Sequence, residues 1–239
     1  MSDTVTIYID GVEIESQPDQ SLLQAADAAG VYIPRLCFLA GVTPHGSCRV
    51  CTVMVNGRPA AACTTPVVQG MIVENDSERL RALRRDLIDM LFVEGNHFCM
   101  FCEASGRCEL QALAYRLGIT APRHPYQYPQ RGVDATHPDV FLDHNRCILC
   151  ARCIRTSREI DGTNALGFVG RGHHKALQPN AREGLGGTRM TKVDRAVTAC
   201  PVGALVPKHR GYDVPVGRRP YDHRPIGSDV ESRRGRKEE

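Results

Sequence analysis

The first third of the chain alternates apolar and polar residues in two short stretches, a pattern typical of half-buried β-strands. Residues 5–9 lead into an Asp-Gly pair and residues 52–55 lead into an Asn-Gly pair, and both pairs favour tight hairpin turns. Between these stretches, residues 21–29 predict a helix that ends at Gly30. We therefore expect a small unit of strands, hairpins and one helix before residue 76.

Two longer apolar patterns predict helices in the middle of the chain. Residues 77–93 repeat leucine at helical spacing, and residues 109–117 form a second periodic stretch that ends at Gly118. We interpret the leucines of the first helix as one core-facing stripe: Leu80, Leu83, Leu87 and Leu91.

Two other stretches are rich in turn-forming residues. Residues 121–140 contain many Pro, Arg, Tyr and His residues and predict a linker. From Pro207 onward, four Pro and four Gly occur in 33 residues. We expect this C-terminal segment to lie on a partner up to Tyr221 and to fray beyond it.

Composition narrows the class of protein. The 239 residues are 42% apolar and 24% charged, which is ordinary for a globular protein, and 30 basic against 27 acidic residues give a net charge of +3. That balance excludes a nucleic-acid binder that works by charge. The N-terminus lacks the pattern of a secretory signal, so we expect a cytoplasmic protein without a membrane span. Eleven cysteines in such a chain indicate metal ligands rather than disulfides.

The cysteines fall into three groups, and His97 directly precedes the second. The groups are Cys37, Cys48, Cys51 and Cys63; Cys99, Cys102 and Cys108; and Cys147, Cys150, Cys153 and Cys200. With His97 as the fourth ligand of the second group, the chain offers four ligands for each of three sites. The alternative for His97 is a plain surface histidine.

The third group has the spacing C-x2-C-x2-C closed by a distant Cys-Pro, which is the bacterial ferredoxin pattern for a [4Fe–4S] cube. Structural zinc, the alternative, prefers two paired knuckles. In two-cluster ferredoxins the motif occurs twice, but non-cysteine residues occupy all four positions of the other cluster here: Ser157, Met190, Val193 and Ala196. We therefore expect a single cube.

The first group, spaced C-x10-C-x2-C-x11-C, differs from the plant-type ferredoxin spacing. Its setting among hairpins and a helix suggests a ubiquitin-like ferredoxin domain with a [2Fe–2S] cluster, and zinc remains the alternative. The whole chain is thus expected to be α+β. It divides into a β-grasp [2Fe–2S] domain (1–76), a helical His/Cys3 [4Fe–4S] domain (77–120), a linker (121–140), a bacterial-ferredoxin-like domain keeping one [4Fe–4S] cluster (141–206) and a C-terminal arm (207–239).

Several motifs together resemble a known family. They include Gly46-Ser-Cys-Arg-Val-Cys51, Glu94-Gly-Asn-His-Phe-Cys99, Arg146-Cys-Ile-Leu-Cys150 and Cys200-Pro-Val-Gly203. In this order they resemble the N-terminal region of the large iron–sulfur subunit of complex I and of [FeFe] hydrogenases. They resemble still more the small diaphorase subunit of cytoplasmic NAD-reducing [NiFe] hydrogenases. The complex I relatives mostly have H-x3-C, which would require histidine at Gly95, whereas this chain has H-x-C.

The resemblance implies an electron relay with one [2Fe–2S] and two [4Fe–4S] clusters. The partners would be a diaphorase subunit that binds FMN and NAD(H) and the hydrogenase small subunit, and through it the [NiFe] large subunit. The sequence has neither a dinucleotide fingerprint nor a catalytic triad, so we expect no substrate-converting site on this chain. The alternatives are the same subunit of an NADH:quinone oxidoreductase or NAD-dependent formate dehydrogenase, and a zinc-stabilised interaction module. Four arginines beside ligands either tune cluster potentials or are solvated: Arg35, Arg49, Arg146 and Arg152.

Overall fold

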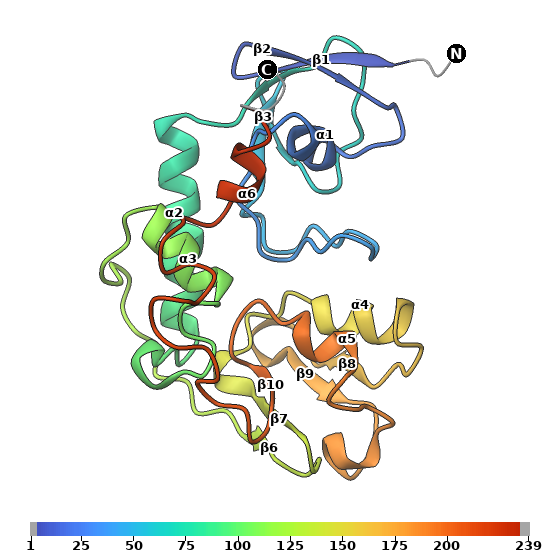
Figure 1. Cartoon of the computed structure of the whole chain (residues 1–239), viewed down its shortest axis with the longest axis vertical. Helices are drawn as coiled ribbons and strands as arrows, with labels where there is room; N and C mark the ends of the chain where they lie inside the picture. The colour runs from blue at the N-terminus through green and yellow to red at the C-terminus, as the bar shows by residue number, and fades with distance from the viewer. Residues whose placement is uncertain (1–3, 235–239) are drawn as a thin grey trace.

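The computed structural model describes residues 4–234. Its N-terminal region is a five-stranded sheet with one helix against it, at the top of Figure 1. The strand order is β2-β1-β5-β3-β4, in which β1 and β5 are parallel and all other neighbours antiparallel. The elements are β1 Val5–Ile9, β2 Val12–Ser16, α1 Leu22–Ala28, β3 Thr52–Val55, β4 Arg58–Ala61 and β5 Ile72–Glu74. The strands, hairpins and helix expected here are confirmed.

Local sequence explains these elements. Strand β1 turns Ile7 and Ile9 into the core, and Ile7 pairs with Ile14 across the hairpin. Helix α1 begins at Ser21, whose hydroxyl accepts the Gln24 N–H while the Gln24 side chain bonds back to the Ser21 N–H. This reciprocal capping box satisfies two amides that the helix itself cannot pair.

Two helices follow, α2 Glu78–Glu94 and α3 Glu109–Arg116. Their positions agree with the prediction, but the leucine stripe on α2 is wrong in part. Leu83 is 38% exposed, whereas Leu80, Arg84 and Ile88 form the fully buried row. Arg84 takes an interior position because its guanidinium donates to the carbonyls of Asn75 at 2.8 Å and Thr52 at 3.0 Å. Buried backbone acceptors thus replace water as its partners.

The third region, at the bottom of Figure 1, contains two small sheets and two short helices. One sheet has the order β10-β7-β6 and the other pairs β8 with β9. The elements are β6 Val133–Asp134, β7 Val140–Asp143, α4 Arg152–Glu159, β8 Leu166–Val169, β9 Ala176–Pro179, α5 Arg195–Thr198 and β10 Leu205–Pro207.

The expected linker, residues 121–140, is less open than its composition suggests. It packs along α2, where the Arg123 N–H donates to Asp89 at 2.8 Å and the Tyr126 hydroxyl donates to the Gly95 carbonyl at 2.7 Å. Its last part forms β6 and the first residue of β7, so the sheet begins before the predicted boundary at 141.

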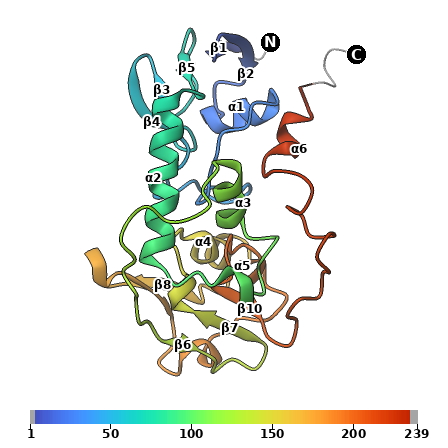
Figure 2. The same ribbon diagram turned by 90° about the vertical axis from the view of Figure 1, so that its left-hand side faces the viewer.

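The C-terminal arm folds back over the chain itself. Figure 2 shows it running from β10 past α3 to a short helix beside α1, α6 Ser228–Glu231. Ile226 and Val230 are buried, and Arg116 donates to the Ile226 carbonyl at 2.7 Å. The expectation that residues beyond Tyr221 fray is therefore wrong for residues 222–234, because apolar burial and this bond hold them; residues 235–239 lie outside the described part.

Among residues 4–234, no helix combines the length and the apolar character that crossing a membrane requires.

Candidate iron–sulfur sites

The first cysteine group lies on the loop between α1 and β3 and just after β4. Cys37, Cys51 and Cys63 are almost fully buried, and the Cys37 N–H donates to Cys48 Sγ at 3.4 Å. The four thiols form a continuous row of contacts: Cys37 contacts Cys48 and Cys63, and Cys63 also contacts Cys51. Contact with the neighbouring thiols lowers the pKa of Cys37 and raises that of Cys63. The site thus gathers four sulfurs that share negative charge, the donor set that a cationic iron centre takes.

The second group lines a small pocket together with Phe92 of α2 and Leu110 and Gln111 of α3. His97 follows α2, Cys99 and Cys102 bound a short 3-10 turn, and Cys108 caps α3 by accepting the Gln111 N–H at 3.5 Å. Burial raises the pKa of Cys108 to about 12. A thiol so removed from water is stabilised as thiolate only by a cation, which a cluster supplies.

His97 lines this pocket and has one ring nitrogen without a hydrogen-bond partner. Its Nε2 is buried and has no hydrogen-bond partner, so the ring's hydrogen bond to the main chain of Leu91 uses Nδ1. Burial, and then the nearby Arg146 charge, lower its pKa to about 4. The imidazole is therefore neutral near pH 7 and oriented by a backbone acceptor, as metal-binding histidines are.

Gly95 accounts for the departure from H-x3-C. A Cβ at this position would stand 2.3 Å from His97 Nε2. A side chain at position 95 would therefore occupy the same space as the His97 ring, and glycine at position 95 leaves that space free.

The third group lines a second small pocket together with Phe168, Leu177 and Leu205. Cys153 lies in the first turn of α4, and Cys200 follows α5. The other two lie on a turn in which Leu149 and Ala151 adopt the left-handed conformation, with φ of 53° and 60°. Burial raises the pKa of Cys147 to about 11 and that of Cys150 to about 12.

Three of the four positions of the absent ferredoxin cluster have become core, and the fourth, Val193, is exposed. Ser157 is fully buried, and its hydroxyl bonds Thr163 at 2.9 Å and the Ala165 N–H at 2.8 Å. Met190 and Ala196 are buried in the apolar core of this region. These side chains fill the space, which supports a single cluster here.

The three groups meet in one apolar core. Cys48, Cys108 and Cys147 all contact the cluster of side chains that includes Leu36, Val50, Ile88 and Leu110. All eleven cysteines are free thiols. Among residues 4–234, no three Cys, His, Asp or Glu side chains converge on a point where a single metal ion would bind.

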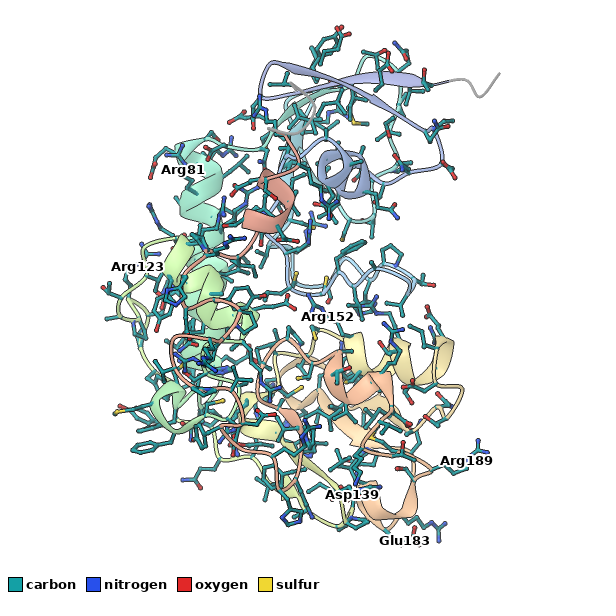
Figure 3. All side chains as sticks on the ribbon, in the orientation of Figure 1. Arg81, Arg123, Asp139, Arg152, Glu183 and Arg189 are labelled. Atoms are coloured by element: carbon teal, nitrogen blue, oxygen red, sulfur yellow. The ribbon has the colours of Figure 1, made fainter. Side chains whose placement is uncertain are left out.

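Hydrogen bonds and one ion pair connect the second site to the third. Arg146 donates to Cys102 Sγ at 3.7 Å, and the Glu109 N–H donates to the Pro201 carbonyl at 2.8 Å. Arg152, at the centre of the molecule in Figure 3, makes a two-fold ion pair with Glu109 at 2.5 and 2.7 Å. Of the four arginines singled out in the sequence, these two are built into the sites.

The remaining two arginines differ from them. Arg35 pairs with Asp27 at 2.6 Å rather than with a sulfur, and Arg49 is exposed. Sequence reasoning gave no role to Glu109, which directly follows Cys108, or to Gly203, although Gly203 ends the motif that begins at Cys200. A Cβ on Gly203 would stand 2.6 Å from Cys102 Sγ.

Comparison with known proteins agrees with this picture. Residues 2–78 match the 2Fe-2S iron-sulfur cluster binding domain, and residues 84–123 match the iron-sulfur binding region of NADH-ubiquinone oxidoreductase G. Residues 137–206 match the ferredoxin-like domain of NADH-quinone oxidoreductase subunit 3. The chain is thus an iron–sulfur protein with one [2Fe–2S] and two [4Fe–4S] domains of the kind found in NADH dehydrogenases.

Comparison with individual proteins identifies the family of the whole chain. The gamma subunit of the NAD-reducing hydrogenase HoxS of Cupriavidus necator is 40% identical over 92% of this chain and 94% of that subunit. A crystal structure of an NAD+-reducing [NiFe]-hydrogenase contains a chain that is 48% identical, with a TM-score of 0.92 over 96% of this chain and 98% of that one. The mitochondrial NADH-ubiquinone oxidoreductase 78 kDa subunit of Candida albicans is 33% identical over 85% of this chain but only 28% of its own length. This chain belongs to the family of the iron–sulfur gamma subunit of NAD-reducing hydrogenases.

Proposed function

We propose that this chain is the electron-transfer subunit of an NAD-reducing hydrogenase, relaying single electrons between an FMN- and NAD(H)-binding diaphorase subunit and the hydrogenase module. In the overall reaction, H2 gives two electrons and two protons, and NAD+ takes two electrons and one proton to become NADH. The observation that carries the proposal is the convergence of three donor sets on one apolar core. Three such sites in one core suit a path for electrons.

Each donor set is assigned to one cluster. Cys37, Cys48, Cys51 and Cys63 hold [2Fe–2S]; His97, Cys99, Cys102 and Cys108 hold one [4Fe–4S]; and Cys147, Cys150, Cys153 and Cys200 hold the other. When bound, each cluster accepts and releases one electron at a time. The chain itself supplies the donors, keeps water out, and places the Arg146 N–H against one donor sulfur. The residues of this chain therefore need no acid or base catalysis.

The domain division follows the sites. The mixed sheet and α1 support a β-grasp domain over 1–76, α2 and α3 a helical domain over 77–120, and the region from β7 to β10 a one-cluster ferredoxin-like domain over 141–206. The partners we propose are the flavin-bearing diaphorase subunit and the hydrogenase small subunit, which connects to the [NiFe] large subunit. We propose a cytoplasmic location, because eleven cysteines that serve as cluster ligands rather than disulfides suit a reducing compartment.

Anaerobic isolation of the tagged chain from its own host, with its partners bound, tests the proposal. About ten iron per chain with matching acid-labile sulfide is expected from the donor sets. Nickel and FMN in the same complex would support the hydrogenase assignment. Flavin without nickel would instead move the chain to an NADH:quinone oxidoreductase or a formate dehydrogenase. Stoichiometric zinc without sulfide would refute the relay and leave the zinc-stabilised interaction module.

A further inference from the structure

Helix α4 carries two charged side chains, one turn apart, that grip the loop of the first site. Arg155 is 4% exposed, and Glu159 lies at the surface. The Arg155 guanidinium donates from Nη1 to the Thr43 carbonyl and from Nη2 to the Cys37 carbonyl. Glu159 Oε2 accepts the Thr43 N–H at 2.7 Å. Together the two side chains form hydrogen bonds with the N–H and the carbonyl of Thr43.

This grip is the main polar attachment of the loop. Within the described part of the chain, both backbone groups of Thr43 bond to α4, and the Ser47 N–H bonds back to the Cys37 thiol at the edge of the loop. Phe38 and Val42 add apolar burial, but most other residues of the loop are exposed. Because the loop has few hydrogen bonds within itself, its contacts with α4 determine its position.

The contact joins two different sites. Cys37 is the first cysteine of the first group. Arg155 lies two residues after Cys153, a cysteine of the third group, on the same helix. Arginine suits this role because its planar fork reaches two carbonyls at once, while its Nε is fixed by the Ala151 carbonyl at 3.2 Å. Lysine, with a single ammonium, holds only one of them well.

We propose that Arg155 and Glu159 are positioning residues that fix the loop of residues 37–48 on α4 and so set the spacing of the first and third sites. The effect on cluster spacing rests on the proposed function, whereas the anchoring of the loop does not. The pair takes no part in bond making or breaking. The Thr43 N–H lowers the pKa of Glu159, which keeps this carboxylate charged beside its partner.

The test uses the full chain isolated anaerobically with its partners. Arg155→Gln and Glu159→Ala break the grip, and Glu159→Ala changes a surface side chain that the fold does not need. Glu159→Gln keeps an oxygen that accepts the Thr43 N–H. Arg182→Gln removes an exposed arginine outside the contact and controls for the loss of one positive charge.

The first readout is hydrogen–deuterium exchange of peptides covering residues 38–47. We expect the Thr43 amide to exchange about tenfold faster in Glu159→Ala, because its acceptor is lost, and in Arg155→Gln, because the two loop carbonyls that hold it in place are released. Exchange at the wild-type rate is expected in Glu159→Gln and Arg182→Gln. This readout does not depend on the clusters.

The second readout is the magnetic interaction between the reduced first and third clusters, measured by electron paramagnetic resonance at equal iron content. The interaction should weaken in Arg155→Gln and Glu159→Ala and stay unchanged in the two controls. Unchanged exchange, or faster exchange with an unaltered magnetic interaction, would overturn the proposal. Absence of iron from the wild-type chain would refute the proposed function separately and leave the exchange result to judge the anchoring.

Discussion

The ion pair between Arg152 and Glu109 is a sensitive point of the structure, because it joins the helices of the second and third sites. The Arg152 side chain is only 5% exposed, and that of Glu109 is 24% exposed. Glu109→Ala removes the carboxylate and leaves the guanidinium buried. Arg152 Nε already lacks a partner, so nothing nearby compensates for the loss.

The size of the effect follows from this burial. Removing one partner of a buried pair costs about 3–5 kcal/mol. Glu109 is partly open to water, which places the cost near the lower end, at about 3 kcal/mol. For a chain of this length, that loss lowers the unfolding temperature by about 6–12 °C. Replacing both residues, as in Arg152→Met with Glu109→Leu, removes the unpaired charge and should stay within about 1 kcal/mol of wild type.

Thermal unfolding of Glu109→Ala and of the double variant, at matched iron content, measures these two free-energy changes. Glu183→Ala, which removes an exposed carboxylate of the third region, serves as the control and should leave the unfolding temperature unchanged. The reasoning fails if Glu109→Ala unfolds within about 1 °C of wild type. It also fails if the double variant is as unstable as the single one.

Three other changes test the sites and the arm. His97→Ala should lower iron from about ten to about six per chain and remove the paramagnetic signal of one cube only, and unchanged iron would show that another residue is the fourth ligand. Gly203→Ala should displace Cys102 Sγ, which a Cβ would approach to 2.6 Å, and so loosen the same cube at a cost of about 1–3 kcal/mol; an intact signal would mean that the backbone yields instead. Arg116→Ala should release the segment around Ile226, costing about 1–2 kcal/mol, and make it a protease target. Resistance to limited proteolysis equal to wild type would show that apolar burial alone holds the arm.

Local signals were enough to predict much of the fold. The helices over 21–29, 77–93 and 109–117 appear within one or two residues of the predicted bounds, because capping residues and glycines mark their ends. The ligand groups could be read because cysteine spacing reflects tight loops around a cluster. The structure brings the first group together through contacts between its thiols and the other two groups around two pockets, while the assignment of individual ligands stays a prediction.

Residues in tertiary contacts escaped prediction. Arg84 and Arg155 are buried, whereas a hydropathy pattern places arginine on the surface. Each is buried because backbone carbonyls from a distant segment meet it, and a linear pattern does not show which carbonyls those are. The folded arm was missed for the same reason: its Pro and Gly content predicts fraying, while Ile226 and Val230 find an apolar surface far away in the sequence.

The path of the C-terminal arm has a consequence for the order in which the protein is completed during synthesis. Tyr32 packs against Gly227, where a Cβ would stand 2.4 Å from its ring. At 5–20 residues per second, the ribosome makes the covering segment roughly 10–40 s after Tyr32. For that interval the nascent N-terminal region exposes an apolar ring, so it is open to chaperones and proteases until the arm emerges. The covering segment thus distinguishes a chain translated past Gly227 from one that stalled before it.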